Sequence, residues 1–295
     1  TLDQGVTLKG ASRDGTILDF QKMCQGFIIT HEGAVLRDLT VTKCLNTSPS
    51  DSSPAYGGAI YIQFGLVENC LISNSKANNP SGKGKYCYGG GVYMKGGVLS
   101  GCEITGCEAG SARVTAIGNA LYIAGGTVTG CDVHHNDGGY TSSNDGTGMN
   151  SASSVVYMDA GSLLFSKIHD NNKDGIPGVY QKGSGTIVAN CLIYGNTGKK
   201  WGGGLYKTSG YTYYCTIWGN VIAGDTSGIS GAYVSGGTMK NCIVVGNGPA
   251  TSSGGSVNVS GGTFQYNVVD KDLAETTKIK DNTNNSDVKF TDAAN

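Results

Sequence analysis

The sequence predicts an all-β fold, a single-stranded right-handed parallel β-helix (a solenoid) of about nine to ten coils. Three observations predict it. A short motif recurs along most of the chain, its apolar runs are short and alternate with a period of two, and Gly or Asn bounds each run. One complete unit runs from Gly202 to Asn220, where Gly-Gly-Gly-Leu-Tyr is followed by Cys-Thr-Ile-Trp-Gly-Asn. Repeats of this kind are the signature of stacked architectures.

The first element of the repeat is a column of small residues, most of them cysteine. Its members are Leu39, Cys70, Cys102, Cys131, Ser166, Cys191, Cys215, Cys242 and Asn267. An aliphatic residue stands two positions after each anchor, which predicts a short strand whose alternate side chains face inward. One unit cannot bury its own apolar face, so the units must stack with equivalent residues about 4.8 Å apart.

The cysteines of this column are predicted to be buried thiols rather than disulfides. Stacked coils hold them farther apart than the roughly 3.8 Å that the Cβ atoms of a disulfide prefer. Cys24, Cys44, Cys87 and Cys107 lie outside the column. Their state stays open, and a loop disulfide between Cys87 and Cys107 is one alternative.

Two further columns belong to the repeat. Asparagines end the strand that follows the anchor, and because their amides can bond in register, a structural ladder is predicted: Asn136, Asn171, Asn196, Asn220 and Asn247. Tyrosines with aliphatic neighbours form the other column: Tyr61, Tyr93, Tyr122, Tyr157, Tyr180, Tyr206 and Tyr233. The sequence does not fix which set faces inward. We expect aliphatic neighbours in the core and an exposed, stacked tyrosine ladder outside.

Composition favours one domain and excludes several partners. The repeat covers residues 1–270, and residues 271–295 form a polar C-terminal segment that could be a last irregular coil. The net charge of −1 gives no reason to expect nucleic acid, and no apolar run is long enough to cross a bilayer. We expect a monomer. The chain does not begin with Met, so we expect a processed or excised segment from which any signal peptide has been removed.

Three polar insertions, residues 46–56, 76–88 and 137–152, are predicted to be surface loops. Long loops on a rigid scaffold either carry function or are simply tolerated. No metal site is predicted, because histidine is scarce and no local CxxC pair occurs. Calcium at Asp137, Asp145 or Asp174 is the only cofactor left open, although their spacing matches no known calcium loop.

One cluster holds most of the titratable residues that could carry chemistry. Stacking brings together outward residues of three coils: Glu103, Asp132, His134, His135, Lys167, His169 and Asp170. If the protein is an enzyme, the catalytic candidates are Glu103, Asp132, Lys167, His169 and Asp170, as an acid/base pair or a base beside a uronate. If it binds a glycan, the contact candidates are His134, His135, His169, Tyr194 and Trp218, because aromatic rings pack on pyranose rings. The alternative is a solvated strand face.

The run Gly57-Gly58-Ala59-Ile60 and the Ile-x-x-Asn turns resemble repeats of bacterial polymorphic outer-membrane and adhesin-like surface proteins, within the pectate-lyase-like (pectin-lyase-like) β-helix superfamily. The resemblance implies a secreted or cell-surface protein. Members of that superfamily include polysaccharide lyases, polygalacturonases and non-catalytic adhesins. Polygalacturonase motifs are absent here, and no arginine lies in the carboxylate columns, whereas pectate lyases use such an arginine.

The sequence is therefore interpreted as an extracellular, non-catalytic domain of a bacterial secreted or surface protein that binds glycans or mediates adhesion. Its partner would be a polysaccharide or another glycan. One alternative is a polysaccharide lyase or glycoside hydrolase acting on an acidic polysaccharide. The other alternative is a structural spacer.

Overall fold

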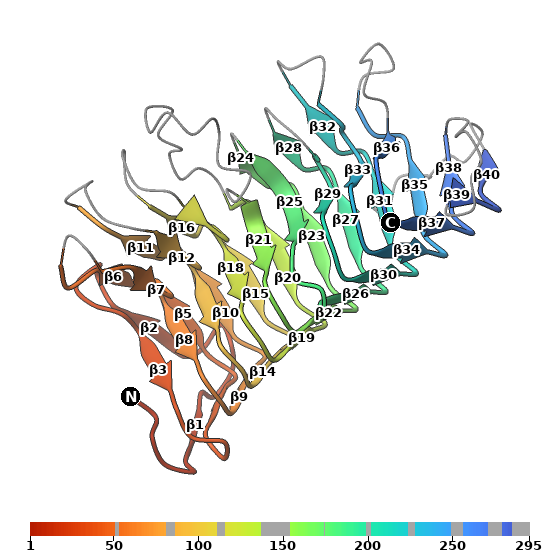
Figure 1. Ribbon diagram of the computed structural model, residues 1–295. Coiled ribbons are helices and arrows are strands. Elements are labelled where there is room, and N and C mark those ends of the chain that lie inside the picture. The colour runs from red at the N-terminus through yellow and green to blue at the C-terminus, as the bar shows by residue number, and fades with distance from the viewer. Residues whose placement is uncertain are drawn as a thin grey trace.

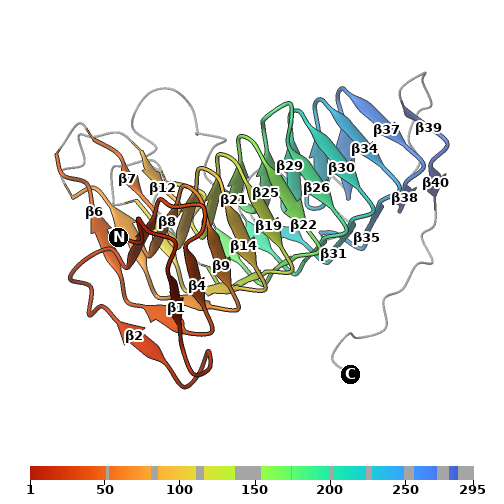
Figure 2. The same cartoon turned by 90° about the horizontal axis from the view of Figure 1, so that it is seen from below.

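The computed structural model describes residues 1–50, 53–80, 86–110, 116–136, 154–173, 175–198, 202–223, 228–248, 256–270 and 279–284. In these residues the chain winds as a right-handed parallel β-helix, which confirms the predicted fold, and no helix occurs among them. Figure 1 shows the coils following one another from the red N-terminal end to the blue C-terminal end, and Figure 2 shows the same rod from below. The described strands form two sheets of eleven and one of nine, close to the predicted number of coils.

Three long sheets make the walls of the rod. Sheet A contains β3 (Phe27–Ile29), β8 (Ile60–Ile62), β13 (Val92–Met94), β18 (Leu121–Ile123), β21 (Ser154–Met158), β25 (Ile176–Gln181), β29 (Leu205–Lys207), β33 (Ala232–Val234) and β36 (Val257–Val259). Sheet B contains β1 (Thr7–Lys9), β4 (Val35–Arg37), β9 (Leu66–Glu68), β14 (Val98–Ser100), β19 (Thr127–Thr129), β22 (Ser162–Leu164), β26 (Ile187–Ala189), β30 (Tyr211–Tyr213), β34 (Thr238–Lys240), β37 (Thr263–Gln265) and β39 (Ile279–Lys280). Sheet C contains β2 (Ile17–Asp19), β5 (Thr40–Thr42), β10 (Leu71–Ser73), β15 (Glu103–Thr105), β20 (Asp132–His134), β23 (Lys167–His169), β27 (Leu192–Tyr194), β31 (Thr216–Trp218), β35 (Ile243–Val245), β38 (Val268–Val269) and β40 (Thr283–Asn284).

Short strands lie where the chain passes from sheet C to the next strand of sheet A. They form three small sheets: β6 (Leu45–Thr47) with β11 (Lys76–Asn78) and β16 (Glu108–Ala109), β7 (Ala55–Tyr56) with β12 (Cys87–Tyr88) and β17 (Ala116–Ile117), and β24 (Asn172–Lys173) with β28 (Thr197–Gly198) and β32 (Val221–Ile222). The number of residues at this corner differs between coils. In one coil the corner lies between Lys167 of β23 and Val179 of β25, and in another, longer one it lies between Asp132 of β20 and Val156 of β21. By contrast, the number of residues between a strand of sheet B and the next strand of sheet C is the same in every coil from β4 to β37.

Strands β39 and β40 continue sheets B and C beyond residue 270. The C-terminal segment predicted for residues 271–295 therefore contributes strand residues to the stack between Ile279 and Asn284. Residues 271–278 and 285–295 of that segment lie outside the described residues.

The inward side chains form one continuous apolar core. Equivalent residues of successive coils are paired in register, as in Val41, Ile72 and Ile104 of sheet C. All three side chains are fully buried, as are Leu36 and Val67 of sheet B. Because each coil buries its apolar face only against its neighbours, the stability of the rod is a sum of coil–coil interfaces.

The cysteine column is buried and unbridged, as predicted. All ten cysteines are free thiols, which includes Cys87 and Cys107, the pair for which a disulfide was left open. Column thiols donate weak hydrogen bonds to backbone carbonyls, as Cys102 Sγ does to Ser100 O at 3.3 Å. The Cys70 N–H in turn donates to Cys102 Sγ at 3.4 Å. The sulfur atoms therefore satisfy polar backbone groups between neighbouring coils.

Two corners of each coil are made by single residues in the left-handed backbone conformation. One corner precedes the cysteine column and the other follows sheet C. Non-glycine residues at these corners include Asn69 (φ 49°), His135 (φ 49°), Phe165 (φ 49°), Asp170 (φ 49°) and Asn190 (φ 55°). Asn and Asp tolerate this region because their short side chains bond locally, whereas the bulky Phe165 carries a conformational cost there.

The predicted asparagine ladder is present and buried. Each asparagine N–H donates to the amide oxygen of the next, as Asn171 N does to Asn196 Oδ1 at 3.2 Å, and the amide groups bond in the same direction. Cys44 and Cys107 lie outside the cysteine column. They occupy the asparagine ladder together with Ser75, since Cys44 N donates to Ser75 Oγ and Cys107 N to Asn136 Oδ1.

Replacing Asn196 with Ala is expected to destabilise the protein by about 2–4 kcal/mol, because it leaves the buried N–H of Asn171 without an acceptor and removes one of the two bonds that Asn171 Nδ2 donates, the other being to Val133 O. The free energy of unfolding from denaturant titration measures the effect. Asn196→Ser is the matched control, because Ser75 already serves this column. We expect about half the loss or less with Ser. Equal losses for Ser and Ala would contradict a hydrogen-bonding role.

The tyrosine column lies outside the core, as expected, but it is not an exposed ladder throughout. The aliphatic neighbours, such as Ile60 and Val92, are fully buried in the core. Tyr122, Tyr157 and Tyr180 are only 6%, 3% and 6% exposed. The expectation of exposure is wrong for these three because Ile117, Ile176 and other residues from the neighbouring short strands and from β25 cover the outer face of sheet A. A second, smaller apolar cluster therefore lies on that face.

Candidate functional site

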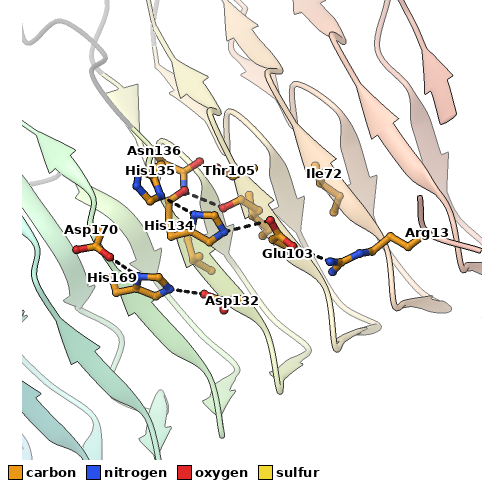
Figure 3. Close-up of polar contacts among 12 residues, drawn as sticks. Arg13, Ile72, Glu103, Thr105, Asp132, His134, His135, Asn136, His169 and Asp170 are labelled. Atoms are coloured by element: carbon orange, nitrogen blue, oxygen red, sulfur yellow. Dashed lines mark hydrogen bonds and ion pairs between the residues drawn. The ribbon is translucent and has the colours of Figure 1, made fainter. Parts of the chain in front are cut away.

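The predicted cluster of titratable residues forms one patch on the outer face of sheet C. Strand register pairs Glu103 with Asp132 and Asp132 with Lys167, and it pairs His134 with His169. The stacking predicted from the repeat is therefore confirmed for all of these positions. Figure 3 shows the side chains on adjacent strands, with Arg13 reaching in from one side. We call this set, with Arg13, Tyr194 and Trp218, the sheet C patch.

Glu103 joins three parts of the chain. Its Oε1 lies 3.2 Å from His134 Nε2, and its Oε2 lies 2.8 Å from a guanidinium nitrogen of Arg13 (Figure 3). His134 Nδ1 lies 2.7 Å from His135 Nδ1, so one of these nitrogens carries the shared proton. Arg13 belongs to the segment between β1 and β2, and its carbonyl accepts a hydrogen bond from Thr40 Oγ1. This contact fixes the segment beside sheet C.

The arginine is the residue that sequence reasoning missed. No arginine occupies a carboxylate column, so the repeat gives no reason to place Arg13 beside Glu103. Arg13 enters from the first coil across the intervening strands β5 and β10. Its position depends on the path of a non-repetitive segment, and no pattern in the sequence signals that path.

His169 lies between two carboxylates. Its Nε2 is 2.7 Å from Asp132 Oδ1, and its Nδ1 is 2.8 Å from Asp170 Oδ2. Burial alone would lower the pKa of His169, but the hydrogen bonds to Asp132 and Asp170 and their negative charge raise it above its ordinary value. Burial likewise opposes ionisation of Asp132, yet the bond from His169 and nearby positive charge lower its pKa. Both ring nitrogens of His169 lie within hydrogen-bond distance of a carboxylate oxygen, and both donate when the ring is protonated.

These shifts have opposite consequences for stability. The raised pKa of His169 means that its ion pairs stabilise the fold below the ordinary histidine range, and that this contribution is lost as the pH rises through the folded-state pKa. The lowered pKa of Asp132 stabilises the fold above the ordinary aspartate range, and this contribution is lost as the pH falls. The patch is therefore most strongly paired in mildly acidic solution.

Aromatic rings continue the patch toward the C-terminal end. The rings of His134 and His169 are stacked with centroids 5.1 Å apart, and His169 stacks on Tyr194 at 4.6 Å. Trp218 follows at 6.5 Å with a 30° tilt. The faces of the inner rings cover one another, so the array presents mainly ring edges and polar atoms to solvent. Lys167 is exposed beside Asp132, and its charge contributes to the lowered pKa of that carboxyl.

The sheet C patch lies apart from two hollows in the described part of the chain. The two hollows found there, near Lys76 and near Tyr61, do not include patch residues. Of the predicted surface loops 76–88 and 137–152, residues 81–85 and 137–152 lie outside the described part. Within the described part, no cluster of His, Cys, Asp and Glu could hold a metal ion. The calcium candidates Asp137, Asp145 and Asp174 also lie outside it.

Comparisons with known proteins add no identification. No family model, no curated protein and no solved structure matches this chain. Nowhere in the described residues is there a helical segment with the length and apolar character that a membrane-spanning helix needs.

Proposed function

We propose that this β-helix is an extracellular, non-catalytic glycan-binding or adhesion domain, and that the sheet C patch is its contact surface. The observation that carries the proposal is the mutual pairing within the patch. His169 uses both ring nitrogens on carboxylates, and Glu103 is held by Arg13 and His134. A general base needs a lone pair that can reach the substrate, and both ring nitrogens of His169 are directed at carboxylates instead. A rigid array of acceptors and ring edges instead suits hydrogen bonding to sugar hydroxyls.

A polysaccharide lyase or glycoside hydrolase is the second candidate. It is favoured by one specific observation, the Arg13–Glu103 pair, because an arginine beside an acid can neutralise a uronate or a developing negative charge. The acidic polysaccharide would then contact Arg13 and Lys167. A structural spacer needs neither the arginine nor the stacked rings.

The test is native affinity electrophoresis against a panel of soluble neutral and acidic polysaccharides, with the same incubations assayed for new reducing ends. We expect retardation by at least one polymer without new reducing ends. The double variant Asp132→Ala with His169→Ala is expected to lose most of this retardation, because it removes both the acceptor and the central ring.

The matched control is Asp19→Ala with Lys43→Ala, which removes another ion pair at sheet C, outside the patch. The control should bind like the unmodified protein. New reducing ends would favour the enzyme instead. If no polymer retards the protein, or if both double variants behave alike, the patch is not the glycan-binding surface.

A further inference from the structure

A groove of about 600 Å³ lies on the outer face of sheet A, at the N-terminal end of the tyrosine column. Its volume is within the range of small-molecule sites. The residues that define its chemistry are Gln25, Ile28, Asn46, Tyr56, Tyr61 and Lys95. None of them belongs to the sheet C patch, so the groove is a separate candidate site.

The groove lies where the stacked tyrosine array ends. Tyr61 stacks on Tyr93 with centroids 5.3 Å apart and ring planes 9° from parallel. On the other side, the strand partner of Tyr61 is Ile28 rather than another aromatic residue. Ile28 and Tyr61 both line the groove. One face of the Tyr61 ring is thus available for another ring of similar size to extend the stack over Ile28.

The side wall of the groove supplies hydrogen-bond acceptors held in fixed positions. Gln25 Nε2 donates to Tyr56 O at 2.8 Å and to Gly57 O at 2.7 Å, and Asn46 Nδ2 donates to Tyr56 O at 2.7 Å. These bonds occupy the amide nitrogens and fix both side chains. Among the described residues, neither amide oxygen has a hydrogen-bond donor. Fixed acceptors of this kind suit a ligand with several hydroxyl groups.

Lys95 adds a cation to the rim. Its side chain is exposed, and no acidic side chain of the described residues pairs with it. Lys182 stands in the same column three strands farther along sheet A, after β25, but its ammonium lies 3.9 Å from Asp159 and 5.9 Å from the centre of the Tyr157 ring. The groove therefore combines the apolar face of a ring, amide oxygens that can accept hydrogen bonds from hydroxyl groups, and a positive charge that no acidic side chain of the described residues pairs with.

We propose that this groove binds a single hexuronate residue, as a free sugar or at the end or branch of a glycan. The apolar face of the pyranose ring packs on Tyr61. Hydroxyl groups donate to the amide oxygens of Gln25 and Asn46, and the carboxylate accepts from Lys95. This inference does not depend on the function proposed for the sheet C patch.

The test uses the methyl glycosides of glucuronate and of glucose, which differ only in the charged group. Binding to the full chain is followed by saturation-transfer NMR with titration. We expect weak binding of the glucuronoside and weaker binding of the glucoside. Lys95→Gln should lower the affinity for the glucuronoside about tenfold and leave the glucoside unchanged. Tyr61→Leu should remove binding of both sugars.

Two variants at equivalent positions serve as controls. Tyr233→Leu changes the same column far from the groove, and Lys182→Gln changes a lysine in the column of Lys95. Both should bind like the unmodified protein, and so should the Asp132→Ala, His169→Ala double variant. The proposal is overturned if neither sugar binds, if Lys95→Gln and Tyr61→Leu bind normally, or if only the sheet C double variant loses binding. The last result would assign the sugar to the patch instead.

Discussion

Under reducing conditions, the protein is expected to unfold in moderately alkaline solution, with most of its stability lost by about pH 10. The cause is the set of buried thiols. Burial raises the pKa of Cys44 and of Cys107 to about 12 and that of Cys87 to about 11. A cysteine in the unfolded chain ionises near pH 8.5. The unfolded state therefore releases protons that the folded state retains.

The sign and the size follow from proton linkage. Groups with raised folded-state pKa values stabilise the fold fully below the unfolded pKa, and this contribution falls by about 1.4 kcal/mol per pH unit above it. Three thiols together lose about 6 kcal/mol by about pH 10. Within the cysteine column the shifts oppose one another, because burial raises the pKa of Cys102 whereas the bond with Cys102 lowers the pKa of Cys70 and of Cys131, and the column is therefore left out of this sum. The total is comparable to the roughly 5–15 kcal/mol that stabilises an ordinary domain.

Circular dichroism across the alkaline range, with a thiol reductant present, measures the transition. Cys107→Asn is the matched variant because Asn136 follows Cys107 in the same ladder, so the variant keeps the acceptor role and removes the thiol. Its unfolding midpoint should move to higher pH, with a stability advantage that grows by about 1.4 kcal/mol per pH unit. An unchanged midpoint, or thiolate absorbance appearing before unfolding, would contradict the mechanism.

The second large effect concerns Lys207, whose side chain is fully buried. Its ammonium nitrogen lies 2.9 Å from Gln181 Oε1 and 2.7 Å from Ser209 O, and no carboxylate is among these partners. Burial lowers the pKa of Lys207 to about 7. The unfolded chain binds this proton up to about pH 10.4, so folding must release it above neutrality. Stability is therefore expected to rise as the pH increases from about 7.

Lys207→Met isolates this contribution. Met94 and Met158 occupy the same inward column, so the replacement has a side chain that the core already accepts. Between about pH 7 and pH 8.5, below the thiol range, the unmodified protein should gain about 2 kcal/mol relative to the variant. At higher pH, the stability gained through Lys207 offsets the stability lost through about one of the buried thiols. Urea titrations at several pH values measure both slopes.

Lys182→Met is the control for Lys207, because Lys182 is exposed and its loss should leave the slope unchanged. A Lys207→Met variant with the same pH dependence as the unmodified protein would show that the folded protein keeps the ammonium charged. In that case the hydrogen bonds to Gln181 and Ser209 would hold a buried cation.

The features that repeat were predictable from the sequence. The cysteine and asparagine columns are set by spacing alone, and spacing also predicted the register that brings His134 beside His169. The features that do not repeat were not predictable. Arg13 approaches Glu103 along an irregular segment, and the tyrosine column is partly covered by short strands whose positions depend on loop paths.

Lys207 and the groove illustrate a second limit. In the sequence, Lys207 is one lysine next to the tyrosine column. Its position in β29 of sheet A shows that it faces inward. The groove at Tyr61 lies where the stacked tyrosine array ends. A repeating sequence pattern does not show where such an array ends. The fold was therefore accessible from the sequence, whereas the features proposed to bind ligand depend on departures from the repeat.

The variable corner between sheets C and A has a consequence for how such a protein can diversify. The two ladders and the constant step from sheet B to sheet C fix the pitch, so residues inserted at that corner leave sheets B and C in register, and the register shift between β21 and β25 of sheet A lies between Ser154 and Val156. Segments from successive coils emerge about 4.8 Å apart. Insertions acquired independently in different coils thus come to lie side by side along one edge. Such an edge can evolve new combinations of loops one coil at a time, while selection on the core stays unchanged.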